Sequence, residues 1–506
     1  MKTTFLPTRL LPHVLTGILL GYPALSGWSV TITNFGYRAI DPSNSRPLLV
    51  IMGDFDCFPE RRITRDNDYY RRLIFDRNTY PSLNGFLWEN SLGRFQVTPA
   101  GPGVIGPFVM STNESFPYFV WKYPVKDYPD RRCETFYYSN VIQRVIDSGL
   151  VDFASFDPNG NSEVEVAELS MTFMNNYGGG ASRRSTCLRL PGISPPYYVG
   201  CWSDSAVFPT NYYITANHAQ GDFESMAHEQ LHQLGLLDLY GRRLIDPGDE
   251  LDPGNLSTMG FTIPPDLYGH PENSNAWYTT ATWNLDPWNR MLLGWCEPRL
   301  ASMDEGGRFI LPAAQLHRAD GPILLYSPNS QYTTNDYFLL EYRTPDTKSA
   351  GHGYDANMGT AGLVIWHFHP DDPKHRVPFV YTEGPTNLVD GSYEPWPGGS
   401  LTPNLAWRPN IPSAARIYVH PFDPGDDYIT IDILVSKDTY VDFASTVQPE
   451  SGSYTHPYNT LAEGVAAASW GSTIQIKGGG HSAEKIQISK ATKLTTYGTG
   501  SVTLGR

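Results

Sequence analysis

The residues whose types and spacing best suit chemistry lie in the stretch H-E-Q-L-H-Q-L-G-L-L-D-L-Y, which begins at His228. His228 and His232 are four positions apart, so on a helix both imidazoles leave the same face, and two neutral imidazoles at that distance can bind one Zn²⁺. Glu229 is placed to reach a water at the open metal position, not the metal itself. Gly235 permits a backbone turn that brings Asp238 back as a third ligand, through oxygen. The pattern predicts a zinc site that activates water; the alternative is an amphipathic helix whose histidines are merely exposed.

The elements that position these side chains are also visible in the sequence. A helix is predicted from about Asp222, whose carboxylate can cap its first backbone N–H groups, and Leu231 and Leu234 lie on its apolar face. The run P-L-L-V-I-M at 47–52 suits a strand that is buried on both faces. Residues 80–101 are typical of a short helix that runs into a strand.

The site resembles that of the immune inhibitor A family of secreted metallopeptidases. Matching stretches follow the family's order and run from about residue 45 to about residue 436: W-E-N-S-L-G-R-F before the zinc motif, and D-P-W-N-R-M-L-L-G-W, D-Y-F-L-L-E-Y-R and A-G-L-V-I-W-H after it. The resemblance implies a metzincin-like catalytic domain, a zinc ion, endopeptidase activity and export, often with structural calcium. In metzincins a methionine turn lies beneath the metal, and Met259 in L-S-T-M-G fits that role, although a methionine beside a glycine is more often only part of the core.

The chain departs from the family pattern at several positions. The family usually has Asp after the second histidine and Pro before the aspartate, where this sequence has Gln233 and Leu237. Several metzincin families carry a tyrosine two positions after the turn methionine, and here that residue is Phe261. The group that stabilises the oxyanion is therefore unassigned; Tyr240 and Tyr268 are candidates, each with a structural role as the alternative.

A second metal site is suggested by D-P-N-G-N-S-E-V-E-V-A-E at 157–168. Its oxygen-bearing side chains have the spacing of a calcium loop, in which alternating oxygens and a final bidentate glutamate surround a hard cation. The usual glycine at the sixth position is replaced by Ser162. The alternative is an Asx-rich turn with a solvated acidic face. The candidate Ca²⁺ ligands are Asp157, Asn159, Asn161, Glu163 and Glu168.

Other histidines and the cysteines have less specific spacings. His367, His369 and His375 could suit another metal, but we favour edge-strand histidines with ordinary partners. Of five cysteines, Cys187 and Cys201 bracket a loop and suit a local disulfide. Cys57 and Cys133 could form a second, leaving Cys296 free; unrelated buried thiols are the alternative.

Composition places the chain among globular proteins, and its first residues resemble an export signal. It has 506 residues, 40% of them hydrophobic and 18% charged, with 46 Gly and 42 Pro, a mixture that favours many short strands joined by turns. The net charge of −15 argues against a nucleic-acid partner. Residues 1–27 combine a positive start, a short apolar run and small residues, as in a signal peptide. No segment has the length of a transmembrane helix.

These observations predict an α+β chain of several parts. We expect a signal peptide at 1–27, a metzincin-like catalytic domain at 28–300 and a β-rich domain at 301–436. The remaining residues, 437–506, begin a new pattern: a helix near 459–468 with a capping box at Thr460 and Glu463, then short alternating strands that resemble the opening coils of a pectin-lyase-like parallel β-helix.

The expected function is that of a secreted, extracellular zinc endopeptidase acting on protein or peptide substrates, with Glu229 as general base. One alternative is a catalytically inactive metallopeptidase fold that acts in adhesion or glycan binding, with cell-surface or glycan contact through the C-terminal segment. A polysaccharide-active enzyme is disfavoured because the segment is too short for a long substrate groove and offers no cluster of acids.

Overall fold

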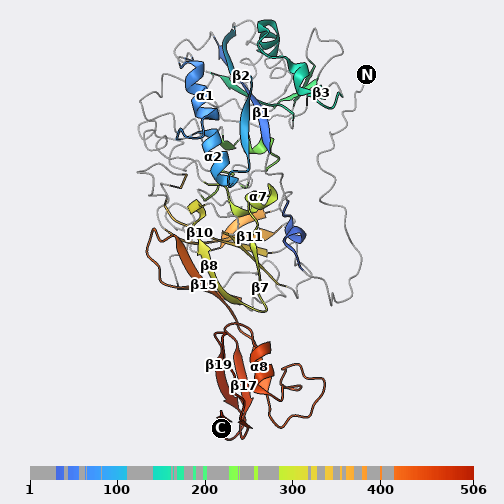
Figure 1. Cartoon of the computed structure of the whole chain (residues 1–506), viewed down its shortest axis with the longest axis vertical. Coiled ribbons are helices and arrows are strands. Elements are labelled where there is room, and N and C mark those ends of the chain that lie inside the picture. The colour runs from blue at the N-terminus through green and yellow to red at the C-terminus, as the bar shows by residue number, and fades with distance from the viewer. Residues whose placement is uncertain are drawn as a thin grey trace, which may run out of the picture.

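The protein has a mixed α+β fold with several sheets and few helices (Figure 1). The computed structural model describes part of the chain, and the statements below concern that part. The predicted signal peptide lies outside it, as do Glu229, Asp238, Tyr240, Phe261 and Tyr268. The described residues are 30–38, 44–55, 63, 65–80, 82–110, 141–160, 163–164, 168–175, 186–189, 198–201, 227–228, 230–236, 239, 256–259, 284–316, 321–327, 337–345, 354–355, 361–369, 379–383, 399–401 and 415–505.

A three-stranded parallel sheet, in the order β2-β1-β4, forms the frame of the N-terminal half. The central strand β1 carries five consecutive fully buried residues, 48–52, because side chains on both of its faces are covered. The predicted strand at 47–52 is therefore confirmed and is longer than expected. The strands are β1 (Ser45–Phe55), β2 (Gln96–Met110) and β4 (Ser170–Asn175).

Two short helices with side-chain caps, α1 (Asn67–Phe75) and α2 (Leu83–Asn90), pack against strand β2 of this sheet. Asp66 accepts from the backbone N–H of Tyr69, and Ser82 from that of Gly85, so each satisfies a free donor in the first helical turn. The predicted transition from helix to strand in 80–101 is confirmed by α2 followed by β2. The other described helices before residue 160 are η1 (Ile32–Phe35), a helix at 141–148 and η3 (Phe153–Phe156).

A second, smaller sheet has the order β3-β6-β5. It places Cys187 opposite Gly200 and Cys201 opposite Thr186, so the two cysteines lie on neighbouring strands, one residue out of register. Their disulfide stays a prediction. The strands are β3 (Glu163–Val164), β5 (Thr186–Arg189) and β6 (Tyr198–Cys201).

Two larger sheets account for the predicted β-rich region. One has the order β12-β11-β10-β9-β7 and the other the order β13-β14-β15-β8. The residues are β7 (Arg299–Ser302), β8 (Gly307–Pro312), η9 (Ala314–Leu316), β9 (Ile323–Tyr326), β10 (Tyr337–Arg343), β11 (Gly362–His369), β12 (Phe379–Glu383), β13 (Gly399–Leu401), β14 (Ala415–Val419) and β15 (Tyr428–Val435).

Strand β10 lies between two hydrophobic cores, and all seven of its residues are buried. Its alternate residues Phe338, Leu340 and Tyr342 join the core shared with β14 and β15. Tyr337 and Leu339 point the other way, into the core that also contains helix α2 and the zinc-motif residue Leu231. The core of the N-terminal half therefore continues past residue 300, while the domain boundary predicted there stays a prediction.

The C-terminal segment stacks its strands in parallel. β16 (Asp438–Val441), β17 (Thr473–Lys477) and β19 (Lys493–Tyr497) form one sheet, and β18 (His481–Ser482) pairs with β20 (Thr503–Leu504). Helix α8 (Leu461–Ala467) begins at Thr460, whose hydroxyl accepts from the Glu463 backbone, as the capping pattern predicted. Figure 1 shows this unit at the end of the molecule that carries the C-terminus.

Among the described residues, no helix is long and apolar enough to cross a membrane.

Candidate metal centre

The zinc motif folds into a short helical segment, residues 227–228 and 230–233, called here the histidine helix. It ends in a turn that is closed by two backbone hydrogen bonds. The Gly235 N–H donates to the His232 carbonyl at 2.9 Å, and the Leu236 N–H donates to the Leu231 carbonyl at 3.3 Å. Gly235 has φ +93°, a left-handed conformation that a residue with a Cβ resists. The turn predicted at Gly235 is therefore present.

The two histidines are close together. Their ring centroids lie 4.8 Å apart, with the ring planes at 89°. His232 is only 3% exposed, and His228 is half-buried. The alternative interpretation, an amphipathic helix with merely exposed histidines, is therefore wrong for His232.

Each of the two imidazoles makes a hydrogen bond through its own Nδ1 atom. Nδ1 of His228 lies 2.7 Å from the Thr258 carbonyl oxygen, and Nδ1 of His232 lies 2.9 Å from the Leu236 carbonyl oxygen. A carbonyl oxygen can only accept, so each Nδ1 carries a proton and donates it. In the neutral ring the lone pair then belongs to Nε2, which is the arrangement that metal-ligating histidines use. The two described imidazoles are therefore of the kind that a zinc ion binds, and the predicted third ligand, Asp238, lies outside the described residues.

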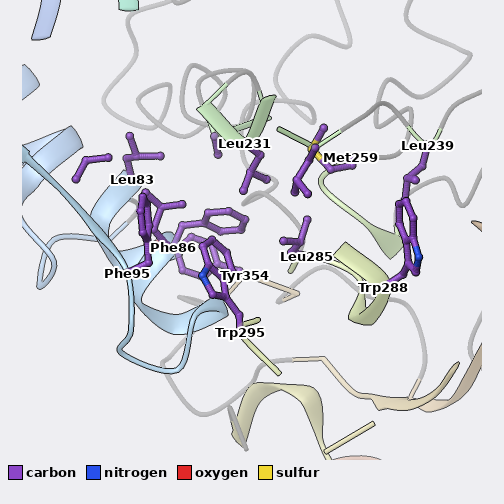
Figure 2. Close-up of a cluster of buried hydrophobic side chains, with 14 of the residues drawn as sticks. Leu83, Phe86, Phe95, Leu231, Leu239, Met259, Leu285, Trp288, Trp295 and Tyr354 are labelled. Atoms are coloured by element: carbon purple, nitrogen blue, oxygen red, sulfur yellow. The ribbon is translucent and has the colours of Figure 1, made fainter. Parts of the chain in front are cut away.

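The segment Leu256–Met259, called here the methionine turn, supports the histidine helix. All four of its residues are buried. The Thr258 carbonyl binds His228, and the Met259 carbonyl accepts from the backbone N–H of Leu239 at 2.8 Å. The turn thus contacts both the first histidine and the residue after Asp238. Figure 2 shows Leu231, Met259 and Leu285 in one hydrophobic cluster.

Helix α7 (Pro287–Leu292) fixes the methionine turn from its other side. Ser257 donates through Oγ to Oδ2 of Asp286 at 2.7 Å, and its Oγ also accepts from the Met259 N–H at 3.2 Å. Asp286 caps α7 through the Asn289 N–H at 2.9 Å. One buried carboxylate therefore joins the start of α7 to the turn, a role that the spacing of the residues did not reveal.

Gln233, where the family usually has aspartate, ties the histidine helix to the parallel sheet. Its side-chain Nε2 donates to the Met171 carbonyl on β4 at 3.3 Å, and its backbone carbonyl accepts from Nη1 of Arg46 on β1 at 2.6 Å. Burial lowers the pKa of Arg46. The departure at this position therefore has a structural role.

The candidate calcium loop is partly described. Nδ2 of Asn159 donates to Oε1 of Glu168 at 2.7 Å, so the third and twelfth positions of the loop meet. Asp157 follows the 3₁₀ helix η3, and its N–H donates to the Ala154 carbonyl. Asn161 and the Glu163 side chain lie outside the described residues. Calcium binding stays a prediction.

The remaining candidates behave as structural residues where they are described. His367 is buried and stacks on Phe338, with ring centroids 4.2 Å apart. It lies on β11, which has neighbours on both sides, so the expectation of an edge strand was wrong. The His369 side chain and His375 lie outside the described residues. Cys296 is a buried free thiol, and burial raises its pKa to about 12.

Within the described parts of the chain, no three His, Cys, Asp or Glu side chains are grouped so as to hold a metal. Two of the predicted zinc-site residues, Glu229 and Asp238, lie outside those parts. A comparison of the sequence with models of protein families and with curated proteins finds no match.

Proposed function

We propose that this chain is a secreted zinc-dependent endopeptidase with a metzincin-like catalytic domain of the immune inhibitor A type. The observation that supports the proposal most is the shared geometry of His228 and His232. Both donate from Nδ1 to backbone carbonyls, so in each neutral ring the lone pair belongs to Nε2, the nitrogen with which such an imidazole binds a metal, and the two rings lie 4.8 Å apart. A pair of solvated helix histidines would not need two such backbone acceptors.

In this proposal His228, His232 and Asp238 hold the zinc. A zinc ion bound there supplies a Lewis acid that lowers the pKa of water toward about 7. Glu229 accepts the proton of the attacking water and then delivers it to the leaving amine. Tyr240 and Tyr268 remain the candidates for stabilising the oxyanion, and the loop 157–168 is proposed to bind calcium.

Casein hydrolysis by the purified chain tests the proposal. We expect cleavage that a zinc chelator abolishes and about one zinc per chain. Glu229→Gln should keep the zinc and lose cleavage by about 100-fold or more, the usual contribution of a general base. The matched control is Glu297→Gln, an exposed glutamate outside the site. Near-wild-type cleavage by the Glu229 variant, or a wild-type chain without zinc, would sink the proposal.

A glycan-binding role for the C-terminal segment is a second candidate, and one observation favours it. Tyr440, Tyr454 and Tyr497 form a cluster of aromatic rings with centroids 5.3–5.8 Å apart, and Tyr454 is 66% exposed. Sugars stack on such rings through their apolar C–H faces. We propose that this segment is a short β-helix-like unit that contacts glycans. Retention on insoluble polysaccharide that Tyr454→Ala reduces would support it, and equal retention of both chains would count against it.

A further inference from the structure

A group of charged residues lies completely inside the protein, and two of its members belong to β10. Charges in this position are expensive unless they are paired and fully hydrogen-bonded. Two cations and two anions balance here, and all four are at most 3% exposed. The group, called here the buried ion network, consists of Arg290, Glu341, Arg343 and Asp355.

Arg343 is the centre of the buried ion network. Its Nε and Nη2 donate to the two carboxylate oxygens of Asp355 at 3.0 and 2.6 Å. Its Nη1 is 3.3 Å from Oε2 of Glu341, whose other oxygen accepts from Arg290. Burial opposes the charge of Arg343, but the two carboxylates outweigh it and raise its pKa. The guanidinium is therefore a fixed cation.

Arg343 also donates one hydrogen bond to a residue outside the buried ion network. Nη1 also donates to the carbonyl oxygen of Leu256 at 3.0 Å, 87 residues away along the chain. Leu256 begins the methionine turn, and two residues later the Thr258 carbonyl holds Nδ1 of His228. A guanidinium on β10 is thus joined to a zinc-site imidazole through two backbone carbonyls.

Asp355 secures the same turn by a second route. Its carboxylate accepts from the Asn284 backbone at 3.0 Å and from the Asn284 side chain at 2.9 Å. Two residues further on, Asp286 accepts from Ser257. Leu256 and Ser257 are consequently held from β10 and from the start of α7, so the Thr258 carbonyl has little freedom to move.

We infer that Arg343 is a positioning residue of the metal centre, which orients His228 by fixing the methionine turn. The inference rests on the proposed zinc site. It needs arginine itself: a lysine ammonium is a single point donor and cannot pair with both oxygens of Asp355 while it binds the Leu256 carbonyl. The metal site therefore extends into the sheet that lies beyond residue 300.

The test is the zinc affinity of the full chain with Arg343→Lys, measured by competition with a chromophoric chelator. Loss of a partner outside the ligand set weakens metal binding by about 10- to 100-fold, and we expect about 10-fold for this more distant one. The visible spectrum of the Co²⁺-loaded chain should also change, because the His228 ring is less tightly oriented. Arg308→Lys is the control for the loss of a bidentate pair, since Arg308, which is half-exposed, pairs with both oxygens of Asp432 in another sheet.

Thermal unfolding of the chelator-treated chains separates positioning from folding. A purely structural role would lower the melting temperature of Arg343→Lys and leave the zinc affinity and Co²⁺ spectrum of the folded chain unchanged, and that result overturns the inference alone. A wild-type chain that binds no zinc overturns the proposed function with it. If Arg343→Lys does not fold, the isosteric Asp355→Asn loosens the same guanidinium, and unchanged zinc affinity there also overturns the inference.

Discussion

The carbonyl oxygen of Thr258 accepts a hydrogen bond from Nδ1 of His228 at 2.7 Å, across 30 residues of chain. The first histidine of the predicted zinc motif thus has a backbone carbonyl as the acceptor of its Nδ1 proton. A backbone acceptor survives most substitutions at its own position, but it depends on everything that fixes the local path of the chain.

Removal of either imidazole should abolish metal binding. We expect His228→Gln and His232→Gln to weaken zinc binding by more than about 100-fold, beyond the usual cost of losing a partner outside the ligand set. Zinc content after dialysis and chelator competition measure it. His481→Gln, an exposed histidine of the C-terminal segment, is the control and should bind zinc like the wild type. Full zinc content in the His232 variant would contradict the assignment.

Gly235→Ala should weaken the site through the backbone alone. A Cβ there meets nothing within 4 Å, so the cost arises from φ +93° and is about 1–2 kcal/mol of the free energy of unfolding. Gly149→Ala is the matched control, with φ +66° and equally open space. Denaturant titration should give similar losses for both variants, and chelator competition should show weaker zinc binding only for Gly235→Ala. Equal zinc affinities would show that the turn does not shape the site.

Ser257→Ala should affect both stability and metal binding. It removes the bond to the buried carboxylate of Asp286 and the bond to the Met259 N–H, at a cost of about 1–3 kcal/mol in the free energy of unfolding. Ser91→Ala removes similar bonds from a serine that is equally buried but does not contact the methionine turn. Only the Ser257 variant should also lose zinc affinity, and a matching loss in Ser91→Ala would refute this role.

Cys296 should make stability fall at alkaline pH. Burial raises its pKa to about 12, whereas an unfolded cysteine has a pKa of about 8.5. The folded state therefore holds the thiol proton more tightly than the unfolded state does. The resulting contribution to the free energy of unfolding is complete below the pKa of the unfolded cysteine. It is lost by about 1.4 kcal/mol per pH unit as the pH rises from that value toward the pKa of the folded state. Denaturant titrations between about pH 8 and 10 measure the slope, which Cys296→Ala should reduce by this amount. An unchanged slope would contradict it.

Local patterns predicted the elements that depend on local signals. The continuous apolar runs of β1, β10 and β11 gave strands, and Thr460 gave the start of α8. The end of β2 was missed because Pro and Gly punctuate its second half. It is an edge strand, where proline is tolerated, and the shifts in its register with β1 absorb the irregularity.

The site was predictable only in its side-chain pattern. Histidines four residues apart on a helix must come together, so spacing alone indicates the pair. The acceptors of their Nδ1 protons are main-chain carbonyls, which every residue has, so residue type carries no signal for Thr258. In the sequence Arg343 is typical of the last residue of a strand. Its hydrogen bond to the Leu256 carbonyl depends on tertiary structure, which local sequence does not reveal. A charged residue on the inward face of an apolar strand was the one available sign.

The hydrophobic core around β10 predicts where inactivating substitutions would lie in the structure after random mutagenesis. Tyr337, Leu339 and Trp366 pack in the same cluster as Leu231 and Met259. Substitutions in strands that carry no ligand would therefore register as loss of metal binding. In a map of inactive clones, the harmful positions would form a continuous band from the histidine helix into β10 and β11.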